Sequence, residues 1–173
     1  MKKSALIIIT AIMAVFFIFV GIIFCYDNIG IRASKLEEDI RVSQKIEDNW
    51  TVEGDVGDSM AAFVSYPQDK SDHTFSFYVK HHGLSFGYFF RAGGNIGEVE
   101  DGIMEITAAD SGERAFISMN KQKAIKAEIY GADEKTVEID GEKPFALVVP
   151  AGTGSVTFYD IDGNVVGYVS RTM

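Results

Sequence analysis

The chain has 173 residues, with 25 acidic and 16 basic side chains, a net charge of −9 and one cysteine. This acidic balance is opposite to the basic surface with which proteins bind nucleic acid, so we expect no nucleic-acid partner. A single cysteine excludes a disulfide within the chain, and the length allows one folded domain beside a membrane segment.

An uninterrupted apolar segment comes after the short basic start of the chain. It extends from Leu6 to Phe24, carries no charge and has Thr10 as its single polar side chain. About 20 apolar residues suffice for a helix that crosses a hydrocarbon core of about 30 Å. We therefore predict a cytoplasmic tail over residues 1–5 and a transmembrane signal anchor over residues 6–25, with the membrane as partner of the latter.

Two features favour an uncleaved anchor over a removable signal peptide. The apolar segment is longer than the usual hydrophobic region of a signal peptide, which has about 7–15 residues, and the bulky stretch 21–26 lacks a small-residue cleavage pattern.

The charges on either side of the segment indicate its orientation. Lys2 and Lys3 lie directly against the segment, whereas Asp27 is the first charge beyond it. We therefore place the N-terminus in the cytoplasm and the C-terminal domain outside, where its acidity should keep it off an anionic bilayer.

A short polar segment over residues 26–49 is predicted to form a juxtamembrane stalk. Ser34 and Glu37 fit a capping box at the start of a helix over residues 34–48. Leu36 and Ile40 give this helix one weak apolar edge, and we expect it to be too polar for a core.

From Trp50 onward the apolar residues alternate with polar ones, as Phe75, Phe77 and Val79 do, which indicates strands. Glycine-containing turns separate about ten strand candidates, at 59–66, 73–80, 84–91, 103–107, 114–119, 124–130, 136–140, 145–149, 155–161 and 164–170. This pattern predicts an all-β sandwich, immunoglobulin-like or jelly-roll-like, over residues 50–173. That region alone is expected to fold as a soluble monomer.

One turn looks like part of a calcium-binding loop. If Gly163 is the sixth residue of such a loop, its first and twelfth positions fall on Phe158 and Val169, where carboxylates are required. The stretch 160–164 is therefore predicted to be a hairpin turn.

The sequence carries no recognisable catalytic motif, such as G-x-S-x-G or a cysteine with a partner. Glu98, Glu100 and Asp101 are typical solvated loop charges. His81 and His82 belong to a predicted exposed turn, with no cysteine or carboxylate at metal-ligand spacing. We therefore predict that the protein is not an enzyme and holds no cofactor or metal.

One strand candidate combines four aromatic residues with an arginine, namely Phe86, Tyr88, Phe89, Phe90 and Arg91. Aromatic faces bind sugars or peptides by stacking, so Tyr88, Phe89 and Arg91 are our candidate ligand-binding residues. The favoured alternative is a central strand buried on both faces, with Phe86, Tyr88 and Phe90 in the core. A small basic spot of Lys121, Lys123 and Lys126 suits an anionic wall polymer, with a solubilising loop as the alternative.

Several stretches resemble uncharacterised single-pass envelope proteins of Gram-positive bacteria. Besides the Met1-Lys2-Lys3 start before a long apolar anchor, these stretches are 69–76, 114–123 and 157–164. The resemblance implies a location in the cytoplasmic membrane and an all-β domain outside it, and it adds no site residue. The last stretch also resembles the terminal hairpin of immunoglobulin-like bacterial surface modules.

The predicted function is that of a non-catalytic binding or interaction module at the cell surface, with an envelope protein or polysaccharide as partner. One alternative is an accessory subunit that contacts a larger membrane complex through its apolar helix. The small residues Ala11, Ala14 and Gly21 of that helix do not form a G-x-x-x-G pair. The other alternative is an envelope hydrolase with an unrecognised site.

Overall fold

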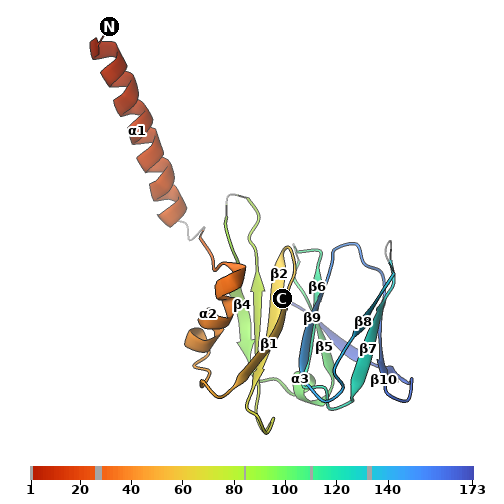
Figure 1. Ribbon diagram of the computed structural model, residues 1–173. Helices are drawn as coiled ribbons and strands as arrows, with labels where there is room; N and C mark the ends of the chain where they lie inside the picture. The colour runs from red at the N-terminus through yellow and green to blue at the C-terminus, as the bar shows by residue number, and fades with distance from the viewer. Residues whose placement is uncertain (1, 26–28, 84, 110, 132–133) are drawn as a thin grey trace.

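An N-terminal helix projects from a β-rich body in the computed structural model (Figure 1). The structure describes residues 2–25, 29–83, 85–109, 111–131 and 134–173. The helix is α1 (Lys2–Cys25), and its window Ile7–Phe24 is long and apolar enough to cross a membrane. No residue of that window is buried by the rest of the described chain, so α1 is an apolar rod with no protein surface to cover it.

The described residues form twelve strands in three four-stranded sheets. The helix-side sheet has the order β1 (Thr51–Val56), β2 (Met60–Tyr66), β3 (Thr74–Val79) and β4 (Phe89–Gly94). The middle sheet has the order β12 (Tyr168–Thr172), β5 (Ile103–Thr107), β6 (Arg114–Ser118) and β9 (Phe145–Val149). The far sheet has the order β11 (Val165–Val166), β10 (Val156–Asp160), β7 (Ala124–Ile129) and β8 (Lys135–Glu138).

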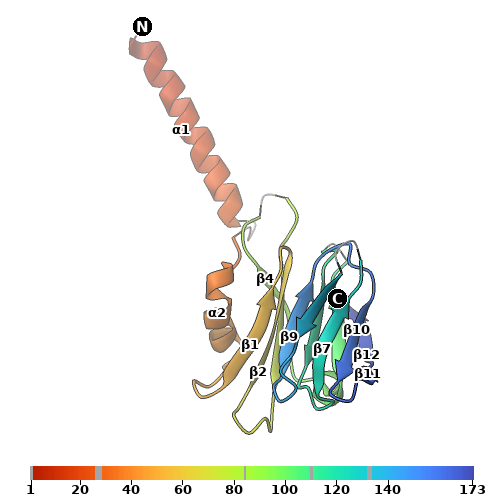
Figure 2. The same ribbon diagram turned by 45° about the vertical axis from the view of Figure 1, so that its right-hand side comes forward.

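The three sheets stack face to face, which Figure 2 shows from the side. The predicted all-β sandwich is thereby confirmed, with a third layer added to the two of a simple sandwich. All strand pairs are antiparallel except β12 with β5, which run parallel. A short helix, α3 (Gly97–Asp101), closes one end between the first two sheets.

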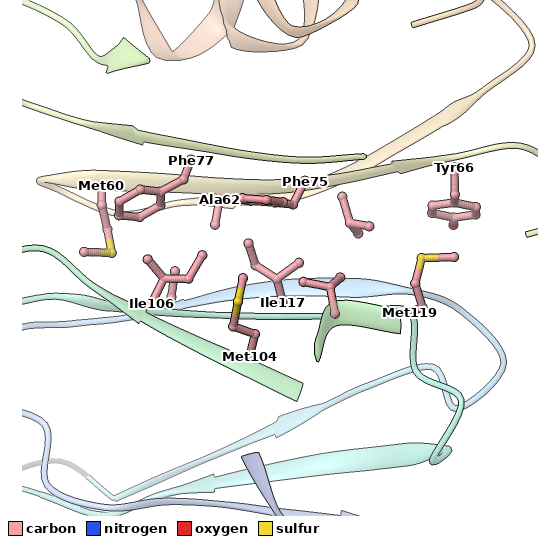
Figure 3. Packing of buried hydrophobic residues seen from close by; sticks show 12 residues of the cluster. Met60, Ala62, Tyr66, Phe75, Phe77, Met104, Ile106, Ile117 and Met119 are labelled. Atoms are coloured by element: carbon pink, nitrogen blue, oxygen red, sulfur yellow. The ribbon is translucent and has the colours of Figure 1, made fainter. Parts of the chain in front are cut away.

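The first apolar core lies between the helix-side and middle sheets. Figure 3 shows Met60 and Phe77 of the helix-side sheet pointing toward Met104, Ile106 and Ile117 of the middle sheet. All five side chains are fully buried. Their removal from water is the main favourable term for joining these two layers.

The second core lies between the middle and far sheets. Phe116 of β6 meets Phe158 of β10 edge to face, with ring centroids 5.1 Å apart, and Phe145 packs beside them. Because Ala115 and Ile117 face the first core while Phe116 faces the second, β6 is buried on both sides. The middle sheet is therefore the centre of the molecule.

A helix covers the outer face of the helix-side sheet. It is α2 (Leu36–Ser43), preceded by a 3-10 turn, η1 (Ala33–Lys35). Leu36 and Ile40 are fully buried in a third apolar cluster, with Phe63 and Tyr78 of the sheet. The Tyr78 hydroxyl donates a hydrogen bond of 2.7 Å to Asp39, which adds a polar link between helix and sheet.

Three expectations about this helix are wrong. It ends at Ser43 instead of residue 48, and its N-cap position is Lys35, without the side-chain bond of a capping box at Ser34. The helix is also not too polar for a core. Two apolar side chains one turn apart are enough to fill the space on the sheet, while Glu37 and Glu38 face water.

One end of the sheets lies next to the last turn of α1, and we call it the anchor end (Figure 1). It contains the β7–β8 and β9–β10 connections and, nearer to α1, the connections between β1 and β2, β3 and β4, and β5 and β6. Lys80 N donates to Ser59 O at 2.8 Å, and Glu113 accepts from Ser59 N at 2.7 Å, so the three connections nearer to α1 are in contact. The other end, with the β8–β9 and β10–β11 turns, is called the opposite end.

Candidate functional site

The three predicted ligand-binding residues lie at the anchor end but in different environments. Tyr88, just before β4, is buried, and its hydroxyl donates a 2.5 Å hydrogen bond to Gly57 O. Phe89 is half-buried and stacks on His81, with ring centroids 4.0 Å apart. Arg91 is exposed. The strand therefore does not present one aromatic platform.

The prediction that Phe86, Tyr88 and Phe90 lie together in a core is correct only for Tyr88. Phe86 is 62 % exposed and Phe90 is 46 % exposed. The reason is that β4 is an edge strand, paired with β3 alone, and it begins at Phe89 instead of residue 84. Leu84, where the predicted strand starts, lies outside the described residues.

Arg91 enters a cavity because of a bulge in β4. The register places Phe90 opposite Tyr78 and Ala92 opposite Phe77, so Arg91 is the extra residue between two paired ones. Bulges of this kind redirect a side chain out of the regular alternation. Here the bulge places Arg91 in the wall of a hollow at the anchor end.

The cavity has a volume of about 280 Å³ and lies between the helix-side and middle sheets. Lys80, His81, His82 and Arg91 line one side, and Met173 belongs to the other. We call it the basic cavity. It is an open surface hollow whose four basic and imidazole side chains are all exposed, so it suits the end of a ligand more than a whole small molecule.

Two basic side chains of the cavity, Lys80 and Arg91, form no ion pair with a described carboxylate. The Lys80 ammonium lies 4.7 Å from the centre of the Tyr88 ring, a cation–π contact that leaves its charge in place. In a chain with a net charge of −9, Lys80 and Arg91 are thus two basic side chains at one hollow for which the described residues supply no ion pair.

The other basic spot is neutralised. Each of its lysines pairs with a glutamate, in the pairs Lys121–Glu100 at 2.6 Å, Lys123–Glu142 at 3.0 Å and Lys126–Glu128 at 2.7 Å. A second hydrogen bond to Glu128 comes from the Tyr130 hydroxyl, and the two donors lower the Glu128 pKa to about 2. The three lysines therefore offer little free charge to an anionic polymer.

The stretch 160–164 is a hairpin turn between β10 and β11, as predicted. One carboxylate oxygen of Asp160 accepts hydrogen bonds from the amides of Asp162 and Asn164, at 2.9 and 2.8 Å. Gly163 has φ of +82°, which suits glycine in such a turn.

Within the described residues no three histidine, cysteine or carboxylate side chains are placed to share a metal ion.

Glu113 is a buried carboxylate that sequence reasoning does not single out. It accepts hydrogen bonds from the amides of Asp58, Ser59 and Met60 and from the Ser59 hydroxyl, at 2.7–2.9 Å. Burial alone would raise its pKa, but these bonds to the charged form outweigh burial and lower it. The donors lie in the β1–β2 connection and at the first residue of β2, so the role of Glu113 is structural.

Three members of the basic cavity, Lys80, His81 and His82, are also missing from the predicted site. The sequence marks His81 as an exposed turn residue, which is correct. Its meeting with Arg91 depends on the pairing of β3 with β4 and on the bulge, and neither is visible in a local pattern.

Comparison with family models, curated proteins and solved structures finds no match to this chain. The indications of function therefore come from the geometry alone.

Proposed function

We propose that the protein is a membrane-anchored binding module that holds an anionic group of an envelope ligand in the basic cavity. The β-domain lies outside the cytoplasmic membrane, and the N-terminus lies in the cytoplasm. The observation that carries this proposal is the convergence of Lys80 and Arg91 on one hollow, without a described carboxylate partner, in an acidic chain. Phosphate or carboxylate groups of an envelope polysaccharide or protein have the matching charge.

The anchoring part of the proposal is supported by α1 and by the segment that connects it to the domain. The window Ile7–Phe24 is long and apolar enough to cross a membrane, although a signal sequence meets the same criterion. The bulky stretch 21–26 offers no small-residue cleavage pattern. The chain is then bonded into the domain from Gly30 onward. The resemblance to single-pass envelope proteins of Gram-positive bacteria agrees with this placement, and we include it in the proposal.

A binding role is favoured over hydrolysis by the acidity of the carboxyl groups. A catalytic general acid needs a raised pKa, so that it still carries a proton near neutral pH. Where a described carboxyl group has a shifted pKa, the shift is downward in every case. Hydrogen bonds or ion pairs with neighbours explain each shift, as in Glu128 and Asp160.

The test is a calorimetric titration of the full chain, in detergent micelles, with a soluble polyphosphate as the anionic probe. We expect binding that weakens with salt, and a loss of about tenfold in affinity in Arg91→Gln, the effect of one charged contact of about 1.4 kcal/mol. Lys80→Gln should act in the same direction. Arg91 is exposed, so its replacement leaves the fold intact.

The matched control is Lys121→Gln, which removes one positive charge from the neutralised spot. We expect its affinity to stay within about twofold of that of the unchanged chain, since Lys121 is already paired with Glu100. If Lys121→Gln weakened binding as much as Arg91→Gln, the probe would be responding to net charge and the basic cavity would not be a site. Neutral dextran serves as the uncharged probe.

A further inference from the structure

The segment that leaves α1 is hydrogen-bonded to the β3–β4 connection. Gly30 N donates to Phe86 O at 2.6 Å, Ile31 N donates to Tyr88 O at 2.7 Å, and Tyr88 N donates to Ile31 O at 2.8 Å. Two glycines make this approach possible. A Cβ on Gly30 would lie 2.5 Å from Tyr88 O, and a Cβ on Gly87 would lie 2.7 Å from the Gly30 carbonyl carbon. We call this contact the glycine clasp.

The glycine clasp lies close to the membrane for reasons of chain length. Ile29 is the fifth residue after Phe24, the end of the apolar window. Even fully extended, five residues span at most about 18 Å. The polar interfacial layer occupies roughly 5–8 Å on each side of the hydrocarbon core. In both views the β3–β4 connection rises to the level of the last turn of α1 (Figures 1 and 2).

Two apolar side chains are exposed at this place. Phe86 is 62 % exposed, and Ile29, its neighbour across the glycine clasp, is 54 % exposed. An exposed phenylalanine and isoleucine side by side are unfavourable in water. They are the residue types that the apolar face of an interfacial segment inserts among lipid headgroups.

The distribution of charge over the domain also bears on which end faces the membrane. Arg32, Lys80 and Arg91 are exposed at the anchor end. The sequence of its connections also contains the acids Asp58, Asp110, Asp133 and Glu134. The turns of the opposite end are mostly acidic, with Asp69, Asp72, Asp140, Glu142 and Asp162 among their residues. An anionic bilayer repels the acids of the opposite end, which favours an orientation with that end away from the membrane.

We propose that Ile29 and Phe86 insert into the interfacial layer of the bilayer that α1 spans, so that the domain has a fixed orientation on the membrane. This inference rests on the proposed anchoring role of α1. The acidic domain as a whole stands off the bilayer, and the apex formed by Ile29 and Phe86 is its point of contact.

The experiment places a tryptophan at the apex of the full chain in vesicles. The chain has one native tryptophan, Trp50, which precedes β1 at the opposite end. The vesicles contain lipids that carry bromine near the headgroup end of their acyl chains. In Phe86→Trp we expect this bromine to reduce the fluorescence of the introduced tryptophan about twofold or more. An inserted side chain reaches roughly 5–10 Å into the boundary of headgroups and acyl chains, where it meets the quencher. The unchanged chain should show little quenching.

The matched control is Val42→Trp, since Val42 is 76 % exposed on α2 and lies away from the apex. Equal quenching of Phe86→Trp and Val42→Trp, in chains that float with the vesicles, would overturn the inference and leave the anchor intact. Failure of the chain to float would reject the anchor, and the inference with it. If Phe86→Trp lost cooperative unfolding, Ile29→Trp on the other side of the glycine clasp would decide by the same measurement.

Discussion

At the scale of single residues, Glu113 organises the anchor end by accepting hydrogen bonds from three consecutive amides and one hydroxyl. These donors belong to a tight connection whose amides would otherwise be buried without partners. Gly57 is part of the arrangement, because a Cβ there would lie 2.7 Å from a Glu113 carboxylate oxygen. The charge of Glu113 is thus matched to backbone donors and not to a basic side chain.

We predict that Glu113→Gln lowers the free energy of unfolding by about 1–3 kcal/mol, because an amide group cannot accept from all of these donors. The effect depends on pH. The folded-state pKa of Glu113 lies below its ordinary value of 4.5, so its stabilisation is full above that value. It is lost as the pH falls through the lowered, folded-state pKa. Urea unfolding of both chains from pH 7 to pH 3 measures the difference.

Glu134→Gln is the control for this measurement, because Glu134 is exposed and belongs to another connection of the same end. Its free energy of unfolding should differ from that of the unchanged chain by less than about 0.5 kcal/mol. The structural role of Glu113 is contradicted if the difference between Glu113→Gln and the unchanged chain stays constant down to pH 3.

The sequence identifies part of the basic cavity at this scale. Arg91 is recognised because it ends an aromatic run flanked by glycines, and Phe89 shares the stack with His81. Lys80 is not recognised, because it ends an ordinary alternating strand. Arg91, the other cationic residue of the cavity, lies in β4, beyond the β3–β4 connection. The one-residue bulge in β4 places Arg91 in the wall of the same cavity. Such non-local registers leave no mark in a local pattern.

At the scale of elements, α2 is predicted to contribute to the stability of the domain. Leu36→Ala should cost about 2–5 kcal/mol of unfolding free energy, because Leu36 is fully buried against the helix-side sheet and its removal leaves a cavity. Val42→Ala on the same helix, at an exposed position, should cost less than about 0.5 kcal/mol. Thermal melts followed by circular dichroism compare the two.

A stalk helix that stands apart from the domain would give the opposite pattern. In that case Leu36→Ala and Val42→Ala would leave the melting temperature equally unchanged. Equal, small shifts would therefore show that α2 does not pack on the sheet in solution.

Strand positions are predicted best where a strand is apolar in its own right. The bounds of β5 and β9 agree with the sequence prediction, and β6 differs by one residue. β1 is missed, since Glu53, Gly54 and Asp55 give it no apolar face. Its place is determined by β2, because Gly54 lies beneath the Phe63 ring, where a Cβ would come within 1.9 Å of the ring. The partner, and not the strand itself, determines this element.

At the scale of the whole molecule, the segment from Ile29 to Trp50 is predicted to belong to the folding unit. A fragment of residues 29–173 should unfold cooperatively, with a melting temperature at least about 10 °C above that of residues 50–173. The shorter fragment exposes the face of Phe63 and Tyr78 that Leu36 and Ile40 cover. Differential scanning calorimetry of the two fragments measures this.

The shorter fragment should also bind a dye that is specific for exposed apolar surface, and the longer one should not. If both fragments melted at the same temperature without dye binding, the packing of α2 would add nothing to the domain. Residues 50–173 would then be the independent domain that the sequence pattern predicts.

The arrangement of three sheets is the least predictable feature of the fold. Most strand patterns indicate a buried face, and the apolar run Ala115-Phe116-Ile117 fits burial on both faces. Nothing local says which sheet a strand joins. β9 pairs with β6 across a separation of about 30 residues, and β12 returns to β5 across more than 60. Such pairings are selected by the whole packing, which the sequence pattern does not contain.

The glycine clasp also determines how a mechanical force would travel through the protein. A pull on α1 first loads the three hydrogen bonds that join Gly30 and Ile31 to the β3–β4 connection. The next contact in line is α2 on its sheet, and after it β1, an edge strand. The middle sheet enters this path at β1, because Val148 N of β9 donates to the Asp55 carboxylate of β1 at 2.8 Å. A tether built in this way yields in small steps at its own attachment, while the centre of the domain stays folded under load.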